Sequence, residues 1–208
     1  MRLETGKPTL FLEETLRNLS PDPQEFMWGH HPAFGEPFLR EGVRLFVPAG
    51  KGEVHSPAFS GSTVLQPGDC FQWPLAAGNG EMIDLSRVAG KEAGFSELIY
   101  LQELSGGWYA VVDPQKKLGI GLAWPLELFP YLWFWLVYGR SPGYPWWSRT
   151  YCIALEPWTS IPNNLNEAIS RGNQAHLKGG EQINVTLCAS VITDLEYVKA
   201  VHLDGAFE

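Results

Sequence analysis

The sequence has few charged residues and almost no clustering of positive charge. Charged side chains make up 18% of the 208 residues, and the formal net charge is −8. An average globular protein has roughly 25% charged residues. Lys116 and Lys117 are the only adjacent basic pair, so the chain lacks the cationic surface that binds a phosphate backbone. We therefore expect no nucleic-acid partner.

Cysteines and long apolar runs are also scarce. Cys70, Cys152 and Cys188 lie far apart and form no CxxC pair, which excludes a zinc knuckle and a thioredoxin-type site. Their odd number favours a reducing compartment. The N-terminus lacks the apolar core of a secretory signal. The most apolar stretch, residues 128–138, is shorter than the roughly 20 residues that cross a bilayer. The sequence predicts a cytoplasmic protein with no membrane partner.

Turn-forming and aromatic residues are abundant instead. The chain contains 22 glycines, 16 prolines and nine tryptophans. Because 45% of its residues are hydrophobic, it can bury a core, which excludes disorder. Short apolar runs separated by turn signals are typical of an all-β antiparallel sandwich, and we expect residues 1–208 to form a single domain. The candidate strands are residues 10–16, 43–47, 98–104, 108–112, 118–124 and 182–191.

Turn signals predict how some of these segments connect. The Ser-Gly-Gly sequence at residues 105–107 separates two candidate strands and predicts a hairpin, because glycine admits the backbone conformations of tight turns. Residues 113–117 predict a second hairpin directly after it. One short helix is expected to follow Asn163 or Asn164, whose side chain can cap it, and to end at Gly172.

Two segments contain residues suited to acid–base chemistry. The first is Phe-Met-Trp-Gly-His-His-Pro-Ala-Phe-Gly at residues 26–35. If this segment is extended, His30 and His31 point to opposite faces, because successive side chains of a strand alternate. Pro32 then holds His31 extended at the end of the strand. An alternative is that one histidine hydrogen-bonds a buried carbonyl while the aromatic residues belong to the core.

The second segment is Ala-Leu-Glu-Pro-Trp-Thr-Ser at residues 154–160. Glu156 directly follows an apolar run, at the point where a strand leaves the core. Burial at this point would raise the pKa of its carboxyl group and make it a general base near neutral pH. An alternative is that Glu156 caps the following helix or pairs with Arg171.

A block of aromatic residues lies between these two segments. Phe134 is expected in the core, whereas Trp146 and Trp147, in a loop rich in proline and glycine, suggest a binding surface. Aromatic rings pack well against the C–H faces of sugars. The sequence contains no GxSxG, GxxxxGK(S/T) or HExxH motif, so the corresponding catalytic templates are excluded.

Taken together, the two segments resemble the signatures of the aldose 1-epimerase family, whose members have a galactose mutarotase-like fold. Gly-His-His-Pro-Ala-Phe-Gly resembles the histidine signature of that family, and Leu-Glu-Pro-Trp-Thr-Ser resembles its glutamate signature. The resemblance runs in order from about residue 25 to residue 191. The matching positions downstream of the glutamate are Pro162, Leu165, Glu167, Ala168, Gly172, Leu177, Gly180 and Glu181.

The resemblance implies a sugar site on the concave face of a large antiparallel sandwich. His31 would be the general acid and Glu156 the general base that open and close the ring of an aldose. This reaction interconverts the anomers of the sugar with no metal or organic cofactor. The two groups would face each other across a gap one sugar ring wide. The tryptophans expected to contact the sugar are Trp28, Trp133, Trp146 and Trp158.

The chain departs from the family pattern in two respects. The histidine and arginine that grip the sugar in the family lie upstream of the histidine signature, and neither Arg2 nor Arg17 matches them. Trp133 stands where the family often has a glutamine, whose paired donor and acceptor a tryptophan lacks. We therefore expect the C-terminal part of an epimerase-like sandwich, lacking upstream strands. Its exposed sheet edges would let copies of the chain associate as homo-oligomers.

Two other functions are compatible with the same residues. A non-catalytic carbohydrate-binding module would hold a sugar with Trp146 and Trp147, and its acid–base pair would be idle. A structural β-domain would bind no sugar at all. Sugar binding without any acceleration of anomer exchange would favour the binding module over the enzyme.

Overall fold

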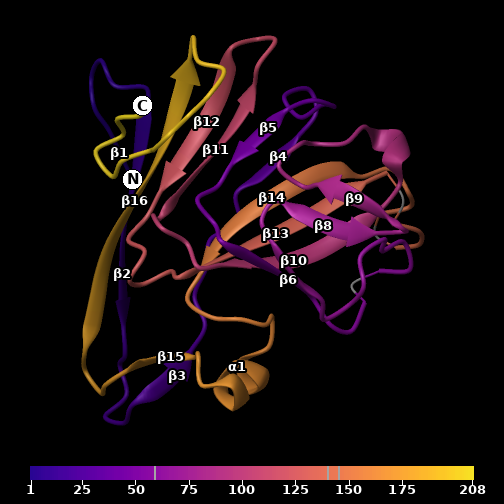
Figure 1. Cartoon of the computed structure of the whole chain (residues 1–208). Coiled ribbons are helices and arrows are strands. Elements are labelled where there is room, and N and C mark those ends of the chain that lie inside the picture. Colours follow the sequence, from indigo (N-terminus) through magenta and orange to yellow (C-terminus); the bar gives the residue numbers. More distant parts are fainter. Residues whose placement is uncertain (59, 140, 145) are drawn as a thin grey trace.

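Strands account for most of the ordered elements in the computed structural model, which describes residues 1–58, 60–139, 141–144 and 146–208. They form two six-stranded sheets and two small two-stranded sheets. The strand pairs are antiparallel, and the two large sheets pack face to face (Figure 1). The prediction of an all-β antiparallel sandwich is confirmed.

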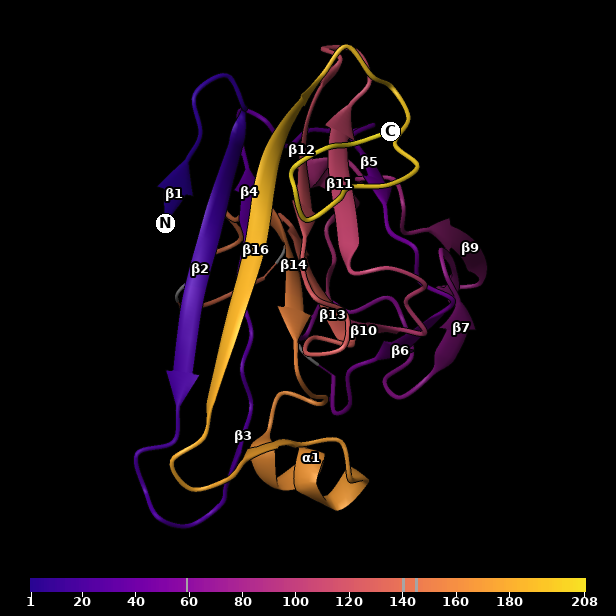
Figure 2. The ribbon, with the colours of Figure 1, turned by 90° about the vertical axis from the view of Figure 1, so that its left-hand side faces the viewer.

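The first large sheet combines strands from both ends of the chain with a hairpin from its middle. The longest pairing joins β2 to β16, and Figure 2 shows these two strands extending together beyond the rest of the sheet. In spatial order the strands are β1 (Arg2–Leu3), β2 (Thr9–Arg17), β16 (Gln182–Thr193), β12 (Leu118–Ala123), β11 (Trp108–Asp113) and β5 (Arg44–Phe46).

The second large sheet carries the candidate site. Its strands β13 and β14 are neighbours, and Trp133 lies opposite Glu156 in their pairing. In spatial order the strands are β4 (Ala33–Gly35), β14 (Tyr151–Trp158), β13 (Tyr131–Tyr138), β10 (Ser96–Gln102), β6 (Lys51–Val54) and β7 (Cys70–Gln72).

Smaller elements connect the two sheets or lie at their ends. The predicted helix is present: Asn164 caps it by accepting hydrogen bonds from the backbone of its first turn, and Gly172 ends it with a φ of 70°. The smaller elements are β3 (Gln24–Phe26), β15 (Ala175–Leu177), β8 (Leu75–Gly78), β9 (Glu81–Asp84), the 3₁₀ helix η1 (Lys91–Ala93) and α1 (Leu165–Arg171).

The core lies between the two large sheets, and β13 shows how the sequence produces it. Leu132, Phe134 and Leu136 alternate along the strand and are fully buried between the sheets. Trp133 and Trp135 lie at the intervening positions and point to the outer face. Because both faces of β13 are covered, its sequence is a continuous apolar run rather than an alternating one. The expected core position of Phe134 is confirmed.

One of the two predicted hairpins is wrong. The segment 113–117 does connect β11 to β12, but β10 pairs with β13 and β6 and not with β11. The chain at Gly107 crosses from the second sheet to the first, close to the end of β12. A Cβ atom at Gly107 would lie 2.2 Å from the carbonyl oxygen of Trp124, so glycine is required there for a close approach of two backbones.

The C-terminal segment, residues 194–208, covers the outer face of the first sheet (Figure 2). Val198 and Val201 are buried there against Ala110 and Ile192. A Cβ atom at Gly121 would lie 2.7 Å from Val201, so the segment lies close to β12. Aliphatic and aromatic side chains therefore cover this face together.

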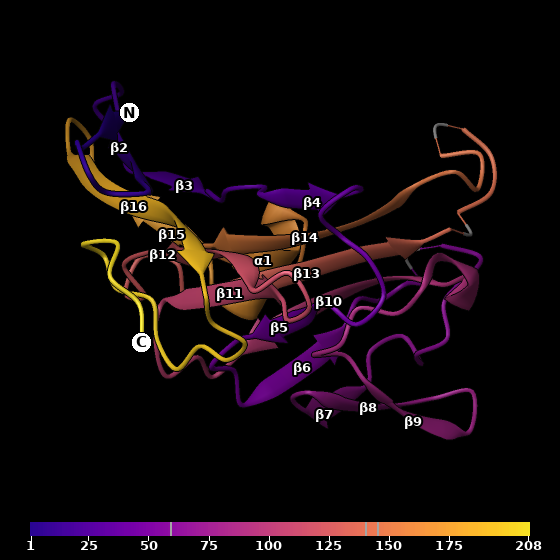
Figure 3. The ribbon, with the colours of Figure 1, turned by 90° about the horizontal axis from the view of Figure 1, so that it is seen from above.

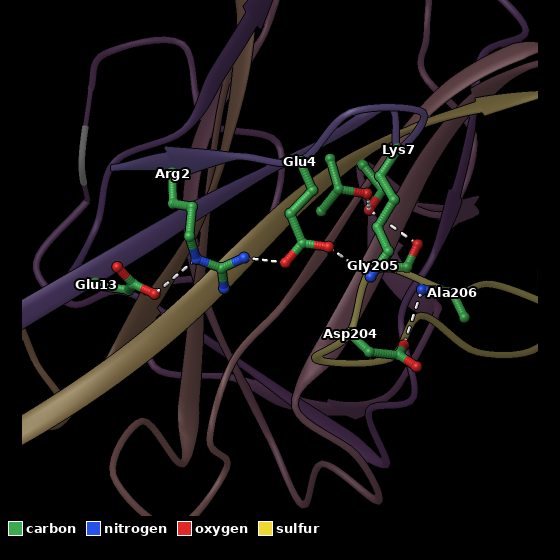
Figure 4. Close-up of polar contacts among 9 residues, drawn as sticks. Arg2, Glu4, Lys7, Glu13, Asp204, Gly205 and Ala206 are labelled. Carbon is green, nitrogen blue, oxygen red and sulfur yellow. Dashed lines mark hydrogen bonds and ion pairs between the residues drawn. The ribbon is translucent and has the colours of Figure 1, made fainter.

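Exposed polar contacts accompany the strand ends on the same side of the molecule. Arg2 pairs with Glu13 at 3.0 Å and also with Glu4 (Figure 4). Asp204 accepts a hydrogen bond from the backbone N–H of Ala206 at 2.9 Å. Because these groups face solvent, we expect each contact to contribute little to stability.

Candidate active site

The outer face of the second sheet bears a cavity of about 400 Å³. Alternate residues of β13 and β14 form its floor, and residues from three loops form its rim. Its volume falls in the range of roughly 300–1,000 Å³ that is usual for small-molecule sites. The lining residues are His31, Leu98, Trp133, Trp135, Trp146, Glu156, Trp158 and Asn163.

Glu156 is the buried carboxylate of this cavity, and its side chain is only 6% exposed. The indole N–H of Trp158 donates to its Oε2 at 3.1 Å, which fixes the rotation of the carboxylate and turns Oε1 toward His31. Burial raises the pKa of Glu156, and this outweighs the lowering by Trp158 and by His31. The carboxylate is thus a better proton acceptor than an exposed glutamate.

Both alternative roles considered for Glu156 are wrong. Asn164, and not Glu156, caps α1. Arg171 pairs with Glu53 at 2.7 Å. The carboxylate therefore has its contacts inside the cavity.

His31 lies just before β4 and is the exposed partner of Glu156. Its Nε2 atom is 3.4 Å from Oε1 of Glu156, and its side chain is 57% exposed. Its ring packs edge-on against Trp135, with 5.9 Å between the ring centroids. The two groups thus face each other, but they are in contact rather than separated by the width of a sugar ring.

His30 points away from the cavity, so the two histidines alternate as predicted. Its Nε2 atom is 2.7 Å from Oε2 of Glu14. Its ring also packs against Phe129, with 5.2 Å between centroids. Only His31 can therefore contact a ligand in the cavity.

Stacked indoles form the floor beside the carboxylate. The rings of Trp133 and Trp158 are 4.1 Å apart and nearly parallel, at an interplanar angle of 12°. The indole N–H of Trp133 donates to the carbonyl of Ser160 at 3.0 Å, which holds the ring in place. Trp146 comes from the connection between β13 and β14, and its ring lies 5.4 Å from that of Trp135. Three of the four tryptophans proposed to contact a sugar therefore line the cavity.

Trp28, the fourth, lies elsewhere. Its ring packs against Phe129 at 5.3 Å and against His30 at 5.9 Å, on the side of the core between the sheets. Its backbone exchanges hydrogen bonds with Thr159, each of 2.9 Å. Trp28 thus connects the histidine segment to the end of β14 but does not line the cavity.

Three lining residues were not among the predicted site residues: Leu98, Trp135 and Asn163. Trp135 could have been found, because it lies two positions from Trp133 on the same strand and so shares its face. Leu98 lies opposite Trp135 in the β10–β13 pairing, which the sequence does not reveal.

A buried tyrosine holds the Asn163 end of the cavity. The hydroxyl of Tyr100 accepts the backbone N–H of Asn163 at 3.2 Å and lies 2.7 Å from Nδ1 of His55. Burial raises the pKa of Tyr100, so the hydroxyl stays neutral. The Tyr100 ring also packs edge-on against Trp133 at 5.4 Å. The loop that carries Asn163 is thereby tied to the floor.

Within the described ranges, no group of three or more His, Cys, Asp and Glu side chains is arranged to hold a metal ion. No helix in the same ranges is both long and apolar enough to span a membrane.

A family model described as a domain of unknown function, DUF4432, matches residues 1–191. Among solved structures, the Slr1438 protein of Synechocystis has a TM-score of 0.62 at 20% identity, over 90% of this chain and 52% of that one. A candidate aldose 1-epimerase from Klebsiella pneumoniae has a TM-score of 0.63 at 16% identity, over 91% and 44%. A galactose mutarotase-like protein from Lactobacillus casei has a TM-score of 0.55 at 21% identity, over 90% and 60%.

These likenesses establish the fold, which is that of the galactose mutarotase-like sandwiches. This chain spans about half the length of the first two solved chains and 60% of the third. A search of curated proteins gives no match.

Proposed function

We propose that this chain, which belongs to the DUF4432 family of domains of unknown function, binds an aldose in the cavity of its second sheet and interconverts its anomers. Solved structures described as a candidate aldose 1-epimerase and a galactose mutarotase-like protein share its fold and support this proposal. The observation that carries it is the contact of 3.4 Å between His31 and the buried Glu156 inside an aromatic cavity.

The reaction needs one base and one acid at opposite sides of the anomeric carbon. Glu156 removes the proton of the C1 hydroxyl. The electron pair of that O–H bond forms the C1 carbonyl while the bond from C1 to the ring oxygen breaks. His31, as imidazolium, donates its proton to the released ring oxygen. Rotation about C1–C2 and reversal of the same steps give the other anomer and restore both groups.

The surrounding residues prepare Glu156 and His31 for these roles. Histidine donates and regains a proton near neutral pH because its ordinary pKa is about 6.5. The Trp158 N–H holds the carboxylate by Oε2 and leaves Oε1 for the substrate. Because His31 is largely exposed, its ring can move off Glu156 when the sugar enters. The indoles that line the cavity then provide apolar contacts for the C–H groups of the sugar.

The test is anomer exchange followed by magnetisation-transfer NMR on aldoses at equilibrium. We expect His31→Ala to lower the enzyme-dependent exchange rate by about 10² to 10⁴-fold, the usual contribution of a general acid. His202→Ala is the control, because His202 lies on the C-terminal segment and also pairs with a glutamate. Equal exchange rates for wild type, His31→Ala and His202→Ala would refute the assignment.

A second function, sugar binding without catalysis, is favoured by the exposed Trp146, which lines the cavity. In that case aldoses would quench the tryptophan fluorescence of the protein, and anomer exchange would stay at the rate of the uncatalysed reaction.

A further inference from the structure

The connection between β13 and β14, within residues 139–150, carries most of the exposed aromatic side chains among the residues that the structure describes. Three of the four exposed aromatic side chains among the described residues lie in it: Tyr144 at 85%, Trp147 at 59% and Trp146 at 36%. Figure 3 shows this connection projecting from the second sheet beyond the end of β4. The exposed aromatics are therefore gathered beside the cavity rather than scattered.

Trp146 joins this aromatic surface to the cavity. Its ring lines the cavity and contacts Trp135, which in turn contacts His31. Trp147 follows it directly, and its ring meets that of Tyr144 edge-on at 6.4 Å. Trp135 and Trp146 thus extend from His31 to the loop that carries the Tyr144–Trp147 pair.

The backbone of the connection is bent in an unusual way at this point. Trp147 and Ser148 have φ angles of 51° and 57°, in the left-handed region that bulky residues seldom adopt. Backbone hydrogen bonds from Trp147 to Gly143, at 2.7 Å, and from Ser148 to Ser141, at 2.9 Å, stabilise the bend. Such strained conformations persist where the surrounding structure holds them and are concentrated at functional sites.

We propose, on the basis of the proposed function, that Tyr144 and Trp147 form a second sugar subsite. The substrate class is then a reducing oligosaccharide, whose reducing-end unit occupies the cavity while its neighbouring unit packs on this aromatic pair. Anomer exchange requires a free C1 hydroxyl between His31 and Glu156, so the rest of the saccharide must be attached at another carbon. It leaves the cavity past Trp146, where the aromatic pair meets it.

The chemistry of the pair fits a sugar. Aromatic side chains have a broad apolar face, and the phenol and indole groups add a hydrogen-bonding edge that suits hydroxyl-rich ligands. Trp147 directly follows Trp146, which lines a cavity of a size suited to one sugar ring, and a surface for a protein partner would not need such a cavity.

The experiment is calorimetric titration with monosaccharides and with disaccharides that have the same unit at the reducing end. The pairs are glucose with maltose and cellobiose, xylose with xylobiose, mannose with mannobiose, and galactose with galactobiose. For the pair that binds best, we expect wild type to bind the disaccharide about tenfold more tightly. Trp147→Ala, and separately Tyr144→Ala, should bring this ratio close to one and leave the Kd of the monosaccharide unchanged.

Tyr197→Ala is the matched control, because Tyr197 is the fourth exposed aromatic and lies on the C-terminal segment. It should keep the wild-type ratio. A ratio near one in wild type, or one that survives in both Trp147→Ala and Tyr144→Ala, would overturn the subsite while the proposed function stands. Failure of every saccharide to bind wild type would refute the proposed function and with it the subsite. Sedimentation showing that the aromatic pair joins two copies of the chain, with dimers lost in Trp147→Ala, would also overturn the subsite.

Discussion

The molecule has a histidine–glutamate pair on the outer side of each of its two sheets, and the two pairs have almost the same length. His31 and Glu156 are 3.4 Å apart on the second sheet, and His202 and Glu208 are 3.3 Å apart on the segment that covers the first. Their surroundings differ. The side chain of Glu156 is 6% exposed and that of Glu208 is 66% exposed.

The coverings of the two sheets explain this difference. The C-terminal segment packs on the first sheet through apolar side chains such as Val198 and Val201, and its His202 and Glu208 side chains stay exposed to water. On the second sheet, flat indoles leave a cavity, and the carboxylate lies in its wall. A distance alone therefore does not identify a site. Both histidines line a cavity, of about 400 Å³ for His31 and about 420 Å³ for His202, so it is burial of the carboxylate, which raises the pKa of Glu156, that distinguishes one pair from the other.

The largest expected effect comes from removing the charge of each glutamate in turn. Glu156→Gln should lower the rate of anomer exchange by about 10² to 10⁴-fold, because the amide cannot accept the proton of the C1 hydroxyl. Glu208→Gln should leave the rate unchanged. NMR exchange measurements on both variants test this, and a similar loss in the two would remove the functional distinction between the pairs.

A truncation on the covered face should affect stability without affecting chemistry. Ile192→Ala removes a fully buried side chain beneath the C-terminal segment and should lower the free energy of unfolding by about 2–5 kcal/mol. The exchange rate per folded molecule should be unchanged. Urea denaturation and NMR exchange are the measurements. If the rate of anomer exchange per folded molecule falls in Ile192→Ala, the covered face is coupled to the cavity.

Trp158→Phe tests how the hydrogen bond from Trp158 affects the pKa of Glu156. This change removes the indole N–H that donates to Oε2, a bond that lowers the pKa of the carboxyl group. Without it the pKa rises further, so the acid limb of the pH–rate profile should move to higher pH. A hydrogen bond to a charged group is typically worth about 1.5–3 kcal/mol.

Trp133→Phe is the matched control, because the Trp133 N–H donates to the carbonyl of Ser160 and not to the carboxylate. It should leave the acid limb in place. Identical shifts in the two variants would mean that packing, and not the hydrogen bond, sets the pKa of Glu156.

The smallest expected effect is a gain of stability in Glu156→Gln at neutral pH. Burial raises the pKa of Glu156 in the folded state, so the folded protein binds the proton more tightly than the unfolded chain. The stability linked to this proton is complete below the unfolded-state pKa, about 4.3, and is lost as the pH rises through the folded-state value. A glutamine at position 156 carries no charge, so the Glu156→Gln variant does not lose this stability as the pH rises.

The gain should therefore appear in urea denaturation at about pH 7 and disappear below about pH 4. Glu208→Gln should change the unfolding free energy by less than about 1 kcal/mol at either pH, as is usual for an exposed pair. A gain in Glu156→Gln that is independent of pH would contradict the role of the buried charge.

Local features of the fold could be predicted from the sequence because they depend on residues near one another in the chain. The cap at Asn164 and the end of α1 at Gly172 follow from the chemistry of single side chains. The turn at residues 113–117 forms the predicted β11–β12 hairpin. The Ser-Gly-Gly sequence at residues 105–107 does not form the predicted hairpin, because a glycine that permits a tight turn also permits the close crossing between two sheets at Gly107.

The candidate site could be predicted only in part for the same reason. Alternation along an extended segment separates His30 from His31, and burial at a strand end identifies Glu156. The register of β13 with β14 and β10 decides which indoles share the cavity, and no local pattern encodes it. For this reason the sequence does not reveal that Trp28 packs on Phe129 and lies outside the cavity.

The most direct measurement is a crystal structure of the protein soaked in an aldose that it binds. We expect a sugar ring in the cavity beside Trp133 and Trp158, with the C1 hydroxyl within about 2.6–3.2 Å of Glu156 and the ring oxygen within the same reach of His31. A sugar bound at another surface, with His31 and Glu156 still in contact and the cavity empty of sugar, would contradict it.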